Sequence, residues 1–454
     1  MTNEEDGVSE GYKEYPDYIV LPTLEEEKAF RQSVRGGRTY KSKHKFVSKQ
    51  YEGFKADEID FDDIDDYIID ADVVSLYPTA MANPVGQCKK LLPHEHEMRG
   101  KMGIYNIEYI TNKNLQHSIG GRRGEDGSLK WDLKDGSGYY TSVDIEDMEK
   151  NGYKIKILSG YYWEKTGFIF KSFIEKLFKE KQNATKGSVQ YNLAKLFMNA
   201  LYGKMIQRPI YNKTQTISTN AEYWKFWGKN IITGVEKLGE TWVLTGTPKE
   251  VKIEERCITK PTHLGAFILA YSRRIMVEYI KEANPYFNSK NEKKRIENDI
   301  YYTDTDSLQM HIKNAKLMKN LGNKNLGGIT DDLGDNCKII RGLWIAPKLY
   351  MLEYIKKGDK TIHYHFRGKG LNKDSLNVKA FEDMDAGKSL TNVRDFQMKK
   401  VHVKRNSKQQ DIPQFSIVHY SKDNELDLTR LTRTVNTTLW DGREFKDNSS
   451  IPWK

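Results

Sequence analysis

The sequence is poor in cysteine, and its cysteines are far apart. The 454 residues include three, Cys88, Cys257 and Cys337, and no two of them form a CxxC pair. Structural zinc sites and disulfide frameworks need several cysteines at short, regular spacings. Neither kind of site is therefore expected, and the spacing is typical of a protein from a reducing compartment.

Long apolar runs and internal repeats are missing as well. No stretch reaches the length of about 18 apolar residues that a membrane-spanning helix needs. The N-terminus, MTNEEDGVSEGYKEYPDY, is acidic and lacks the basic start and apolar stretch of a signal peptide. We see no repeat at a solenoid or propeller period. The sequence therefore predicts no membrane partner.

Charged and aromatic residues are abundant. Charged residues make up 30% of the chain and aromatic residues 11%, and the formal net charge is +10. The aromatic content argues against disorder, and the length allows about three domains. The positive excess favours a polyanionic partner such as nucleic acid.

The order of predicted elements indicates an α+β protein with a helical block between sheet segments. A short apolar run at 67–74 predicts a buried strand, and 103–165 holds further strand-like segments around a glycine-rich loop. Residues 168–204 and 264–279 are predicted helices, and 300–312 reads as a hairpin. Short strands and turns are expected over 205–260.

The first chemically informative residue is Asp72, at the end of the predicted strand 67–74. A single aspartate in such a place is more often structural than catalytic. The strand would, however, present its carboxylate at a sheet edge, where a cation could be held.

The predicted helix 188–202 has two distinct faces. An apolar face at spacings of three and four residues is expected to meet the core and consists of Leu193, Leu196, Phe197 and Ala200. The other face carries Tyr191, Lys195, Asn199 and Tyr202, which suit a triphosphate with a base stacked above it. Just upstream, an apolar stripe from Phe170 to Phe178 leads to Lys181, whose ammonium is expected to point inward toward an anion.

A third segment, Tyr301 to Ser307, contains Asp304 and Asp306. Two carboxylates at this spacing on a strand or tight hairpin share a face and repel each other unless a divalent cation lies between them. With Asp72 and the lysines, the set matches the needs of nucleotidyl transfer, in which two Mg²⁺ ions act on the attacking hydroxyl and the leaving pyrophosphate.

Three motifs in this order resemble those of family B DNA polymerases. DVVSLYP (72–78) is similar to motif A, KLFMNALYG (195–203) to motif B and YTDTDS (302–307) to motif C. The helical block, the RGGRTY segment (35–40), KLY (348–350) and Lys369-Gly370 resemble the protein-primed, organellar and viral branch. The resemblance implies a right-hand polymerase fold: a palm with an antiparallel sheet, helical fingers and a small thumb.

The resemblance also implies a role for each matching residue. Asp72, Val73 and Asp306 would hold two Mg²⁺ ions, for which Mn²⁺ can substitute, and Asp304 would be a peripheral catalytic carboxylate. The incoming dNTP would contact Ser75, Leu76, Tyr77, Lys181, Lys195, Asn199 and Tyr202. Primer–template DNA would contact Arg35, Gly36, Gly37, Lys348, Tyr350 and Lys369. Tyr77 would lie beneath the deoxyribose, where a ribose 2′-hydroxyl would clash.

The same comparison divides the chain into expected domains. Residues 1–66 would form an N-terminal strap with the template-contacting element, and 67–165 the palm around motif A, with a possible insertion. The fingers would span 166–204. The palm would continue over 205–340, with a second possible insertion, and then over 341–375. Residues 376–454 would form the thumb and C-terminal tail.

The chain departs from the family pattern in two places. Val34 stands where the family has the first tyrosine of its YxGG/A element. Only a short segment precedes that element, and it holds no acidic exonuclease motif, so we expect a polymerase without its own 3′–5′ exonuclease. The exonuclease would be a separate chain, or this sequence a truncated product. The DxE sequence that most resembles an exonuclease motif, Asp144 to Glu146, is expected on a surface helix of the palm.

The weaker signals have ordinary explanations. His94-Glu95-His96 has metal-like spacing but no third ligand. The basic clusters 41–45, 122–123 and 399–405 are either solvated charge or phosphate contacts.

The leading hypothesis is a DNA polymerase that uses primer–template DNA and dNTPs, in the cytoplasm, the host's if the source is viral. The alternatives are a non-catalytic DNA-binding replisome subunit and a two-metal nuclease. The priming group, a terminal protein, RNA or DNA, stays open.

Overall fold

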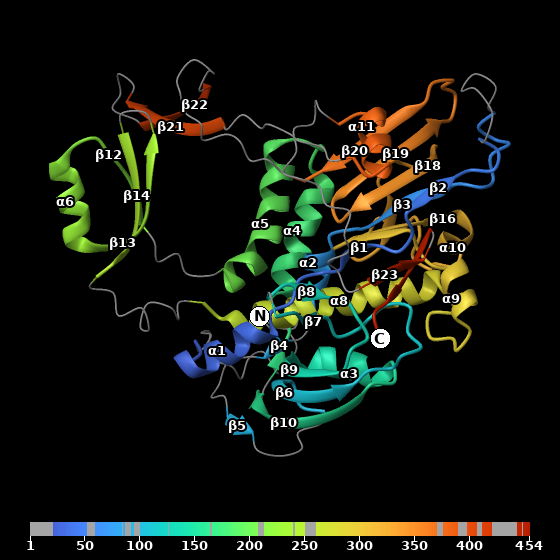
Figure 1. Cartoon of the computed structure of the whole chain (residues 1–454), viewed down its shortest axis with the longest axis horizontal. Coiled ribbons are helices and arrows are strands. Elements are labelled where there is room, and N and C mark those ends of the chain that lie inside the picture. The colour runs from blue at the N-terminus through green and yellow to red at the C-terminus, as the bar shows by residue number, and fades with distance from the viewer. Residues whose placement is uncertain are drawn as a thin grey trace, which may run out of the picture. The chain divides into compact units, whose positions relative to one another are not determined.

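The structure is a computed structural model of the chain (Figure 1). It describes residues 21–51, 60–83, 85–86, 92–94, 100–125, 127–163, 166–207, 213–238, 241–249, 260–369, 376–388, 397–405, 411–419, 443–446 and 448–454; for 85–86, 92–94, 238, 397–405, 411–419 and 446 this covers the backbone only. The chain forms two compact units. Unit 1 comprises 1–207, 258–366 and 437–454, and unit 2 comprises 208–257 and 367–436.

The centre of unit 1 is a nine-stranded sheet with the order β1-β15-β16-β3-β18-β19-β20, in which β17 also pairs with β3 and β2 with β18. Its strands are β1 (Thr39–Lys41), β2 (Lys45–Val47), β3 (Ile68–Val73), β15 (Tyr302–Asp304), β16 (Ser307–His311), β17 (Ile329–Asp331), β18 (Cys337–Ala346), β19 (Leu349–Lys356) and β20 (His363–Gly368). The expected strand at 67–74 and the hairpin at 300–312 are both present, and they pair with each other.

A four-stranded sheet, β5-β10-β6-β9, lies below the long helix α8 in Figure 1. Its strands are β5 (Leu92–His94), β6 (Gly103–Ile110), β9 (Gly136–Thr141) and β10 (Lys154–Tyr162), and α3 (Ser142–Lys150) packs on it. Helix α8 (Thr262–Ala283) is almost entirely buried because it contacts this layer, the central sheet and the helical block. The short pairs are β4 (Val85–Gly86) with β11 (Thr166–Gly167), and β7 (Arg122–Arg123) with β8 (Leu129–Lys130).

The helical block is a hairpin of α4 (Lys171–Asn183) and α5 (Val189–Ile206), and Ser188 caps α5 by accepting a bond from the N–H of Tyr191. The expected core face of α5 is wrong. Leu193, Leu196 and Phe197 are exposed, whereas Ala194, Met198 and Met205 are buried. Only one narrow side of α5 meets α4, α2 and α8, so small and flexible side chains fill that contact.

Smaller helices complete unit 1: α1 (Leu24–Ser33), α2 (Leu76–Met81), α9 (Glu292–Glu297) and α10 (Ile312–Ala315). The hairpin of β23 (Arg443–Lys446) and β24 (Ser449–Pro452), which the sequence assigned to the thumb and tail, also belongs to unit 1. It bonds to the N-terminal part of the sheet, since the N–H of Ser450 donates to the carbonyl of Ser42 at 2.8 Å.

Unit 2 includes a three-stranded sheet, β12-β14-β13, covered by a helix that the sequence did not predict. The strands are β12 (Lys213–Ile217), β13 (Asn230–Leu238) and β14 (Thr241–Pro248), and the helix is α6 (Asn220–Lys229), which starts with a capping box of Thr219 and Glu222. The unit also holds α11 (Val378–Asp385), β21 (Gln397–Arg405) and β22 (Asp411–His419).

Within the described part of the chain, we find no helix with the length and hydropathy that crossing a membrane requires.

Candidate active site

Asp72 lies near the end of β3, between the two strands that flank it. Its cross-strand neighbours are Ser307 on β16 and Thr330 on β17. The apolar residues around it on β3, Ile69, Ala71 and Val73, are buried and fix the strand in the sheet. The sequence therefore places this carboxylate where three strands end together.

Asp306 comes from the turn of the β15–β16 hairpin. The turn is two residues long, Thr305 and Asp306, and Thr305 has a φ of 64°, in the left-handed region that branched residues rarely adopt. The N–H of Val73 donates to the carbonyl of Asp306 at 2.8 Å. This bond ties the turn directly to the residue that follows Asp72.

The two carboxylates influence each other's ionisation. Burial, together with the negative charges of Asp306 and Asp332, raises the pKa of Asp72 to about 7, and the ammonium groups of Lys195 and Lys181 oppose this rise. Burial likewise raises the pKa of Asp306. Carboxylates held together against their repulsion favour a divalent cation.

Lys181 and Lys195 bring the helical block to the carboxylates. The ammonium of Lys181 donates to the hydroxyl of Ser75 at 3.1 Å. Burial lowers its pKa, and the ammonium of Lys195 lowers it further while Asp72 raises it. Lys181 thus points toward motif A, as expected. Its hydrogen-bond partner there is the hydroxyl of Ser75.

Tyr77 and Tyr202 form a stacked pair. Their ring centroids are 4.0 Å apart with an interplanar angle of 21°. Ser75, with a φ of 56°, precedes α2 and turns the chain so that Leu76 is buried and Tyr77 meets α5. Asn199, one turn before Tyr202 on α5, is exposed. Motifs A and B therefore meet through an aromatic contact.

Asp304 faces protein groups from three segments. Its Oδ1 accepts bonds from the hydroxyls of Thr39 at 3.0 Å and Thr305 at 3.2 Å, and forms an ion pair with the ammonium of Lys348. The N–H of Lys348 donates to the hydroxyl of Tyr302 at 2.8 Å. Asp304 thus anchors the hairpin, and its catalytic role stays a prediction.

The two remaining residues expected at primer DNA have different surroundings. Tyr350 is buried against Tyr302, with ring centroids 5.0 Å apart. Lys369 is exposed and lies in unit 2. The DNA contacts of both residues stay predictions.

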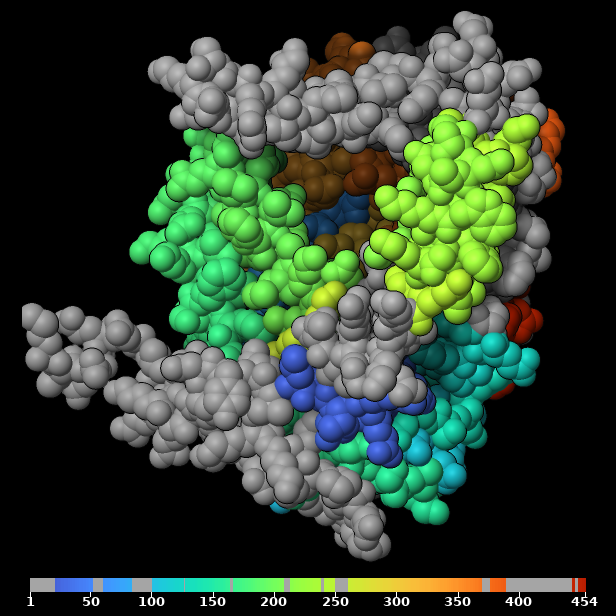
Figure 2. Space-filling view, turned by 90° about the vertical axis from the view of Figure 1, so that its left-hand side faces the viewer, coloured from blue at the N-terminus to red at the C-terminus, as the bar shows by residue number. Residues whose placement is uncertain are grey.

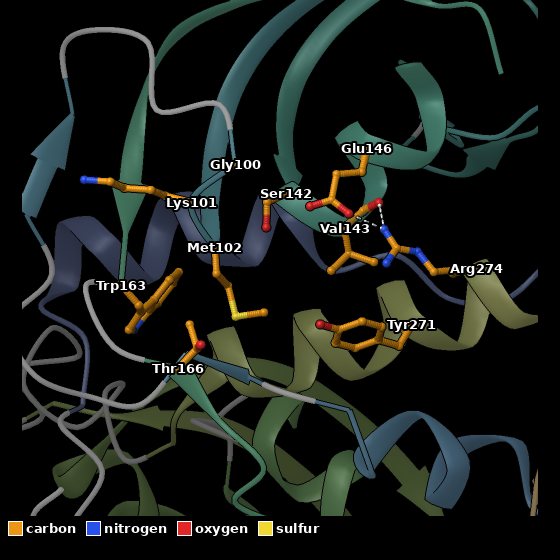
Figure 3. Close-up of a pocket in the computed structure, with 10 residues that line it drawn as sticks. All are labelled: Gly100, Lys101, Met102, Ser142, Val143, Glu146, Trp163, Thr166, Tyr271 and Arg274. Atoms are coloured by element: carbon orange, nitrogen blue, oxygen red, sulfur yellow. Dashed lines mark hydrogen bonds and ion pairs between the residues drawn. The ribbon is translucent and has the colours of Figure 1, made fainter. Parts of the chain in front are cut away.

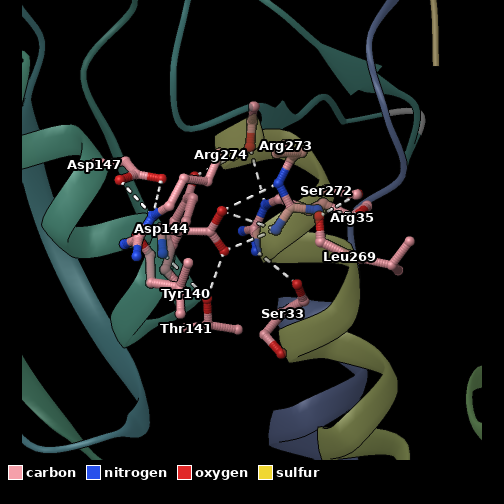
Figure 4. Close-up of polar contacts among 12 residues, drawn as sticks. Ser33, Arg35, Tyr140, Thr141, Asp144, Asp147, Leu269, Ser272, Arg273 and Arg274 are labelled. Atoms are coloured by element: carbon pink, nitrogen blue, oxygen red, sulfur yellow. Dashed lines mark hydrogen bonds and ion pairs between the residues drawn. The ribbon is translucent and has the colours of Figure 1, made fainter. Parts of the chain in front are cut away.

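Arg35 differs from its expected role at DNA. Its guanidinium is buried over the ring of Tyr140, 3.7 Å from the centroid (Figure 4). It donates to the carbonyls of Gly121 at 2.9 Å and Tyr139 at 2.6 Å. In this position Arg35 connects the segment before Gly36 and Gly37 to the four-stranded sheet that contains β9. A charged side chain can be buried when hydrogen bonds, here to backbone carbonyls, compensate for the loss of water.

The two glycines after Arg35 lie beside the turn of the β15–β16 hairpin. The N–H of Thr305 donates to the carbonyl of Arg38 at 2.7 Å, and a Cβ on Gly37 would lie 3.1 Å from the Cα of Thr305. Gly36 has open space around it. The segment 36–38 therefore supports motif C from one side and leaves a bare backbone at Gly36.

Sequence reasoning missed three nearby carboxylates. Asp70 shares the face of β3 with Asp72 and is buried, which raises its pKa to about 7. Asp331 ends β17 and Asp332 follows it, beside β3. The spacing of Asp70 and Asp72 is visible in the sequence, but the pairing of β17 with β3 is not.

The donor set suits a hard cation. Asp72 and Asp306 offer carboxylate oxygens, which Mg²⁺ prefers, and Mg²⁺ sites commonly use one or two carboxylates with water and substrate phosphate completing the shell. No cluster of three or more acidic, histidine or cysteine side chains with metal-binding geometry occurs in the described residues. The two carboxylates therefore fit a site that substrate completes.

Three residues from the other predicted signals have structural surroundings. Asp144, expected on the surface, is buried on α3 and pairs with Arg273 of α8 at 2.8 Å (Figure 4). Lys41 is buried, and Arg122 pairs with Asp132 at 2.6 Å. The side chains of 94–96 and 399–405 lie outside the described residues.

A separate pocket of about 610 Å³ lies between the four-stranded sheet, α3 and α8 (Figure 3). Trp163 and Thr166 line one end, and the ion pair of Glu146 and Arg274 lines the other. None of the residues expected to be catalytic lines it.

The family can now be identified. The profile of DNA polymerase type B, organellar and viral, matches residues 9–285, more than half of the chain and including motifs A and B. The chain belongs to this family of type B DNA polymerases. The motif C segment lies beyond the matched range, but its hairpin pairs with the strand of motif A.

Curated relatives of this type B polymerase come from fungi and a virus. A probable DNA polymerase of Podospora anserina is 27% identical over 275 residues, which are 54% of this chain and 21% of the relative. A DNA polymerase of Kluyveromyces lactis is 28% identical over 326 residues, 66% of this chain and 30% of the relative. The uncharacterized protein 075R of Invertebrate iridescent virus 3 is 28% identical over 142 residues, 31% of this chain and 78% of that protein. The chain thus spans less than a third of the two fungal relatives.

Solved structures show the fold. Phi29 DNA polymerase in a ternary complex with primer-template DNA and incoming nucleotide matches with a TM-score of 0.57 at 18% identity, over 92% of this chain and 64% of that one. The same polymerase complexed with single-stranded DNA matches with a TM-score of 0.55. The family B polymerase therefore has the α+β polymerase fold that its motifs implied.

Proposed function

We propose that the chain catalyses template-directed DNA synthesis by transferring dNMP to a primer 3′-hydroxyl. The observation that carries this proposal is the meeting of Asp72 and Asp306, tied by the bond from Val73 to Asp306, with Lys181 and Lys195 on their open side. Paired carboxylates opposite paired ammonium groups suit a metal-bound triphosphate.

Asp72 and Asp306 would hold two Mg²⁺ ions, with the backbone of Val73 beside them. When bound, these ions supply charge stabilisation for the attacking and leaving oxygens. The protein's own part is to hold both carboxylates at a fixed separation, because β3 and the hairpin turn are locked in one sheet.

The nucleotide would be bound by the helical block and α2. Lys181 and Lys195 would neutralise phosphate oxygens, and Ser75 would keep Lys181 aligned through their hydrogen bond. Leu76 and the stacked pair of Tyr77 and Tyr202 would form the floor under the sugar, with Asn199 facing the new base pair.

Primer–template DNA would lie along the segment of Gly36 and Gly37 and along the β18–β19 hairpin. Gly36 and Gly37 offer backbone without side chains for close approach of the template strand. Lys348 and Tyr350 would support the primer, and Lys369 of unit 2 its terminus. A terminal-protein hydroxyl as primer, and a partner exonuclease, remain hypotheses that extension with each added component would test.

The test is extension of a primed DNA template by the purified chain with Mg²⁺ and dNTPs. Asp306→Asn, which keeps the shape and removes the charge, is expected to lower the rate at least about 1,000-fold, while primer–template binding in EDTA stays within about twofold. Asp62→Asn is the matched control, because Asp62 is exposed and its ion pair with Lys357 is exposed as well.

The outcomes distinguish an active polymerase from a non-catalytic replisome subunit. Synthesis by wild type and Asp62→Asn, lost in Asp306→Asn, supports the polymerase. Folded wild type that binds primer–template but adds no nucleotide would point instead to a non-catalytic replisome subunit. Equal synthesis by Asp306→Asn would overturn the assigned metal site.

A further inference from the structure

The turn of the β15–β16 hairpin has a backbone conformation that its own sequence does not favour. Thr305 has a φ of 64°, in the left-handed region, where a branched side chain is strained. Such a conformation persists only where the surrounding structure enforces it. Asp306, the proposed metal ligand, is the next residue. The contacts that hold Thr305 therefore also fix the backbone that carries the carboxylate of Asp306.

The segment just before β1 supplies these contacts. The N–H of Thr305 donates to the carbonyl of Arg38 at 2.7 Å. This bond continues the β1–β15 ladder by one residue beyond the pair of Thr39 and Asp304. The backbone of Gly37 is close as well, because a Cβ on it would lie 3.1 Å from both the Cα and the Cγ2 of Thr305. Two consecutive residues thus hold the turn from one side.

Arg38 is itself bonded, through its side chain, to another part of unit 1. Helix α1, blue in Figure 2, lies at the surface, but the chain turns inward after it and only 2% of Arg38 is exposed. Its guanidinium donates to the carbonyl of Ser118 at 2.9 and 3.2 Å and to that of Ile119 at 3.1 Å. It also lies over the ring of Trp131, 4.5 Å from the centroid.

The segment that accepts these bonds is firmly packed. Ser118 and Ile119 are buried, and the N–H of Ile119 donates to the hydroxyl of Tyr153 at 3.3 Å. Ile119 is part of the hydrophobic core to which β6, β9 and α3 contribute. The guanidinium is therefore fixed in the layer of the four-stranded sheet, whereas the carbonyl of the same residue supports a turn of the central sheet.

The bonds of the guanidinium fix its direction. Among the described residues, no carboxylate forms a hydrogen bond with Arg38, so backbone carbonyls compensate for its burial. A guanidinium donates through a planar, rigid fork, whereas an ammonium is a single point on a flexible stem. The orientation of the side chain, and with it the position of the carbonyl of Arg38, is therefore closely determined.

We propose that Arg38 is a positioning residue for nucleotidyl transfer. Its fixed side chain holds the carbonyl that keeps Thr305 in the left-handed conformation, and this sets the direction of the carboxylate of Asp306. The inference rests on the proposed polymerase function, which gives that carboxylate its role. A displacement of about 1 Å near a reacting centre can cost about 100-fold in rate. Loss of the guanidinium is therefore expected to slow the reaction although Arg38 touches no substrate.

The first experiment measures the kinetics of Arg38→Met, which removes the guanidinium and keeps a long side chain beside Trp131. We expect kcat to fall about 10- to 100-fold and the Mg²⁺ concentration for half-maximal rate to rise at least about threefold. Loss of folded protein would lower the rate without moving the Mg²⁺ dependence. Arg38→Lys, which keeps the charge and part of the donors, is expected to recover part of both effects.

The second experiment needs neither metal nor nucleotide. Amide hydrogen exchange over residues 301–308 is measured by mass spectrometry, because the N–H of Thr305 is protected by its bond to Arg38. Arg38→Met is expected to speed exchange in this peptide at least about tenfold. Exchange over 68–73, the strand β3, is expected to stay as in wild type, which distinguishes a local opening from unfolding of the sheet.

The third experiment removes the strain instead of the support. Glycine adopts a positive φ without strain, so the turn needs less support in Thr305→Gly. The loss of kcat caused by Arg38→Met is expected to shrink to less than about threefold when it is measured in the Thr305→Gly background. Equal losses in the two backgrounds would contradict the proposal.

Arg295→Met is the matched control. Arg295 is 3% exposed and also donates to a backbone carbonyl, that of Ser289, but its bonds stay within residues 284–295. The substitution is expected to lower the midpoint of thermal unfolding and to leave both the Mg²⁺ dependence and the exchange over 301–308 unchanged. If Arg38→Met does not fold, Arg38→Lys is compared with Arg295→Lys by the same measurements.

Two further results would overturn the proposal. The first is an unchanged Mg²⁺ dependence together with unchanged exchange over 301–308. The second is faster exchange in every peptide of unit 1, which would make Arg38 a structural residue only. Failure of wild type to extend primers, with faster exchange confined to 301–308 in Arg38→Met, would count against the proposed function and leave the support of the turn standing.

Discussion

At the scale of single residues, the stacked rings of Tyr77 and Tyr202 connect motif A to motif B. Burial raises the pKa of Tyr77 above its ordinary value, and Tyr202 beside it adds to the rise, so the phenol stays protonated. Each ring limits the space available to the other, because their centroids are only 4.0 Å apart. A sugar placed above them would meet a rigid surface.

Tyr77→Ala is expected to raise the ratio of ribonucleotide to deoxyribonucleotide incorporation at least about tenfold. Removing the ring opens space for a 2′-hydroxyl, and one lost steric contact corresponds to roughly 1–3 kcal/mol of discrimination. Single-nucleotide insertion with dATP and ATP measures the ratio. Tyr77→Phe is the control, since it keeps the ring, and unchanged selectivity in the alanine variant would refute the steric role.

His263 gives a pH-dependent prediction. It is buried on α8 and stacks on Trp163 with centroids 5.0 Å apart, and neither ring nitrogen has a hydrogen-bond partner among the described residues. Burial lowers its pKa to about 3. The folded protein therefore keeps the ring neutral while the unfolded chain takes up a proton below its ordinary pKa of about 6.5.

Stability from His263 is thus complete above pH 6.5 and is lost as the pH falls toward 3, because the unfolded state binds the extra proton. Relative to His263→Phe, wild type is expected to lose about 2 kcal/mol of unfolding free energy between pH 7.5 and pH 5. Urea unfolding of both proteins at the two pH values measures this. Parallel pH profiles would show that His263 is protonated in the folded state.

At the scale of elements, a buried arginine connects the β23–β24 hairpin to the rest of unit 1. The guanidinium of Arg443 donates to the hydroxyl of Ser450 at 2.8 Å and to the carbonyl of Gln116 at 3.1 Å, and it lies 4.0 Å from Asp299. Burial would raise the pKa of Asp299, but His117 and Arg443 hold it below its ordinary value. The carboxylate is therefore charged and depends on these partners.

Arg443→Met is expected to lower the free energy of unfolding by about 3–5 kcal/mol, since it leaves Asp299 charged and buried with fewer partners. Adding Asp299→Asn is expected to recover part of the loss, which a double-mutant cycle by urea unfolding would show. Lys454→Met is the matched control, because its pair with Glu292 is exposed and contributes less than about 1 kcal/mol. A loss no larger than the control's would mean that the hairpin is fastened in another way.

Elements with a complete local signal could be predicted from the sequence. The apolar run around Asp72, the DTD turn and the helix at 264–279 each carry their pattern within a few residues. Which face of α5 is buried could not be predicted from the sequence. Its apolar stripe does not reveal that the helix packs on one narrow side. The helix α6 was missed because its aromatic residues read equally well as strand.

At the scale of the whole molecule, the residues proposed to be catalytic were easier to find in the sequence than their structural neighbours. Asp72 and Asp306 are recognised by their own short motifs. The bond from Thr305 to Arg38 and the position of Asp331 beside β3 depend on pairings between distant strands, which no local pattern records. The burial of Arg35 follows from the same distant contacts, so its expected place at DNA was the least secure inference.

The pairing of β1 with β15 also bears on how the protein is made. Thr39 and Asp304 are 265 residues apart in the chain, and Lys41 and Ser450 are 409 apart. At a translation rate of roughly 5–20 residues per second, β1 leaves the ribosome roughly 13–53 s before its partner strand is synthesised. During that time the N-terminal strands carry an unpaired edge. Co-translational folding therefore cannot complete the nine-stranded sheet early, and chaperones that bind nascent chains have a long interval in which to hold it.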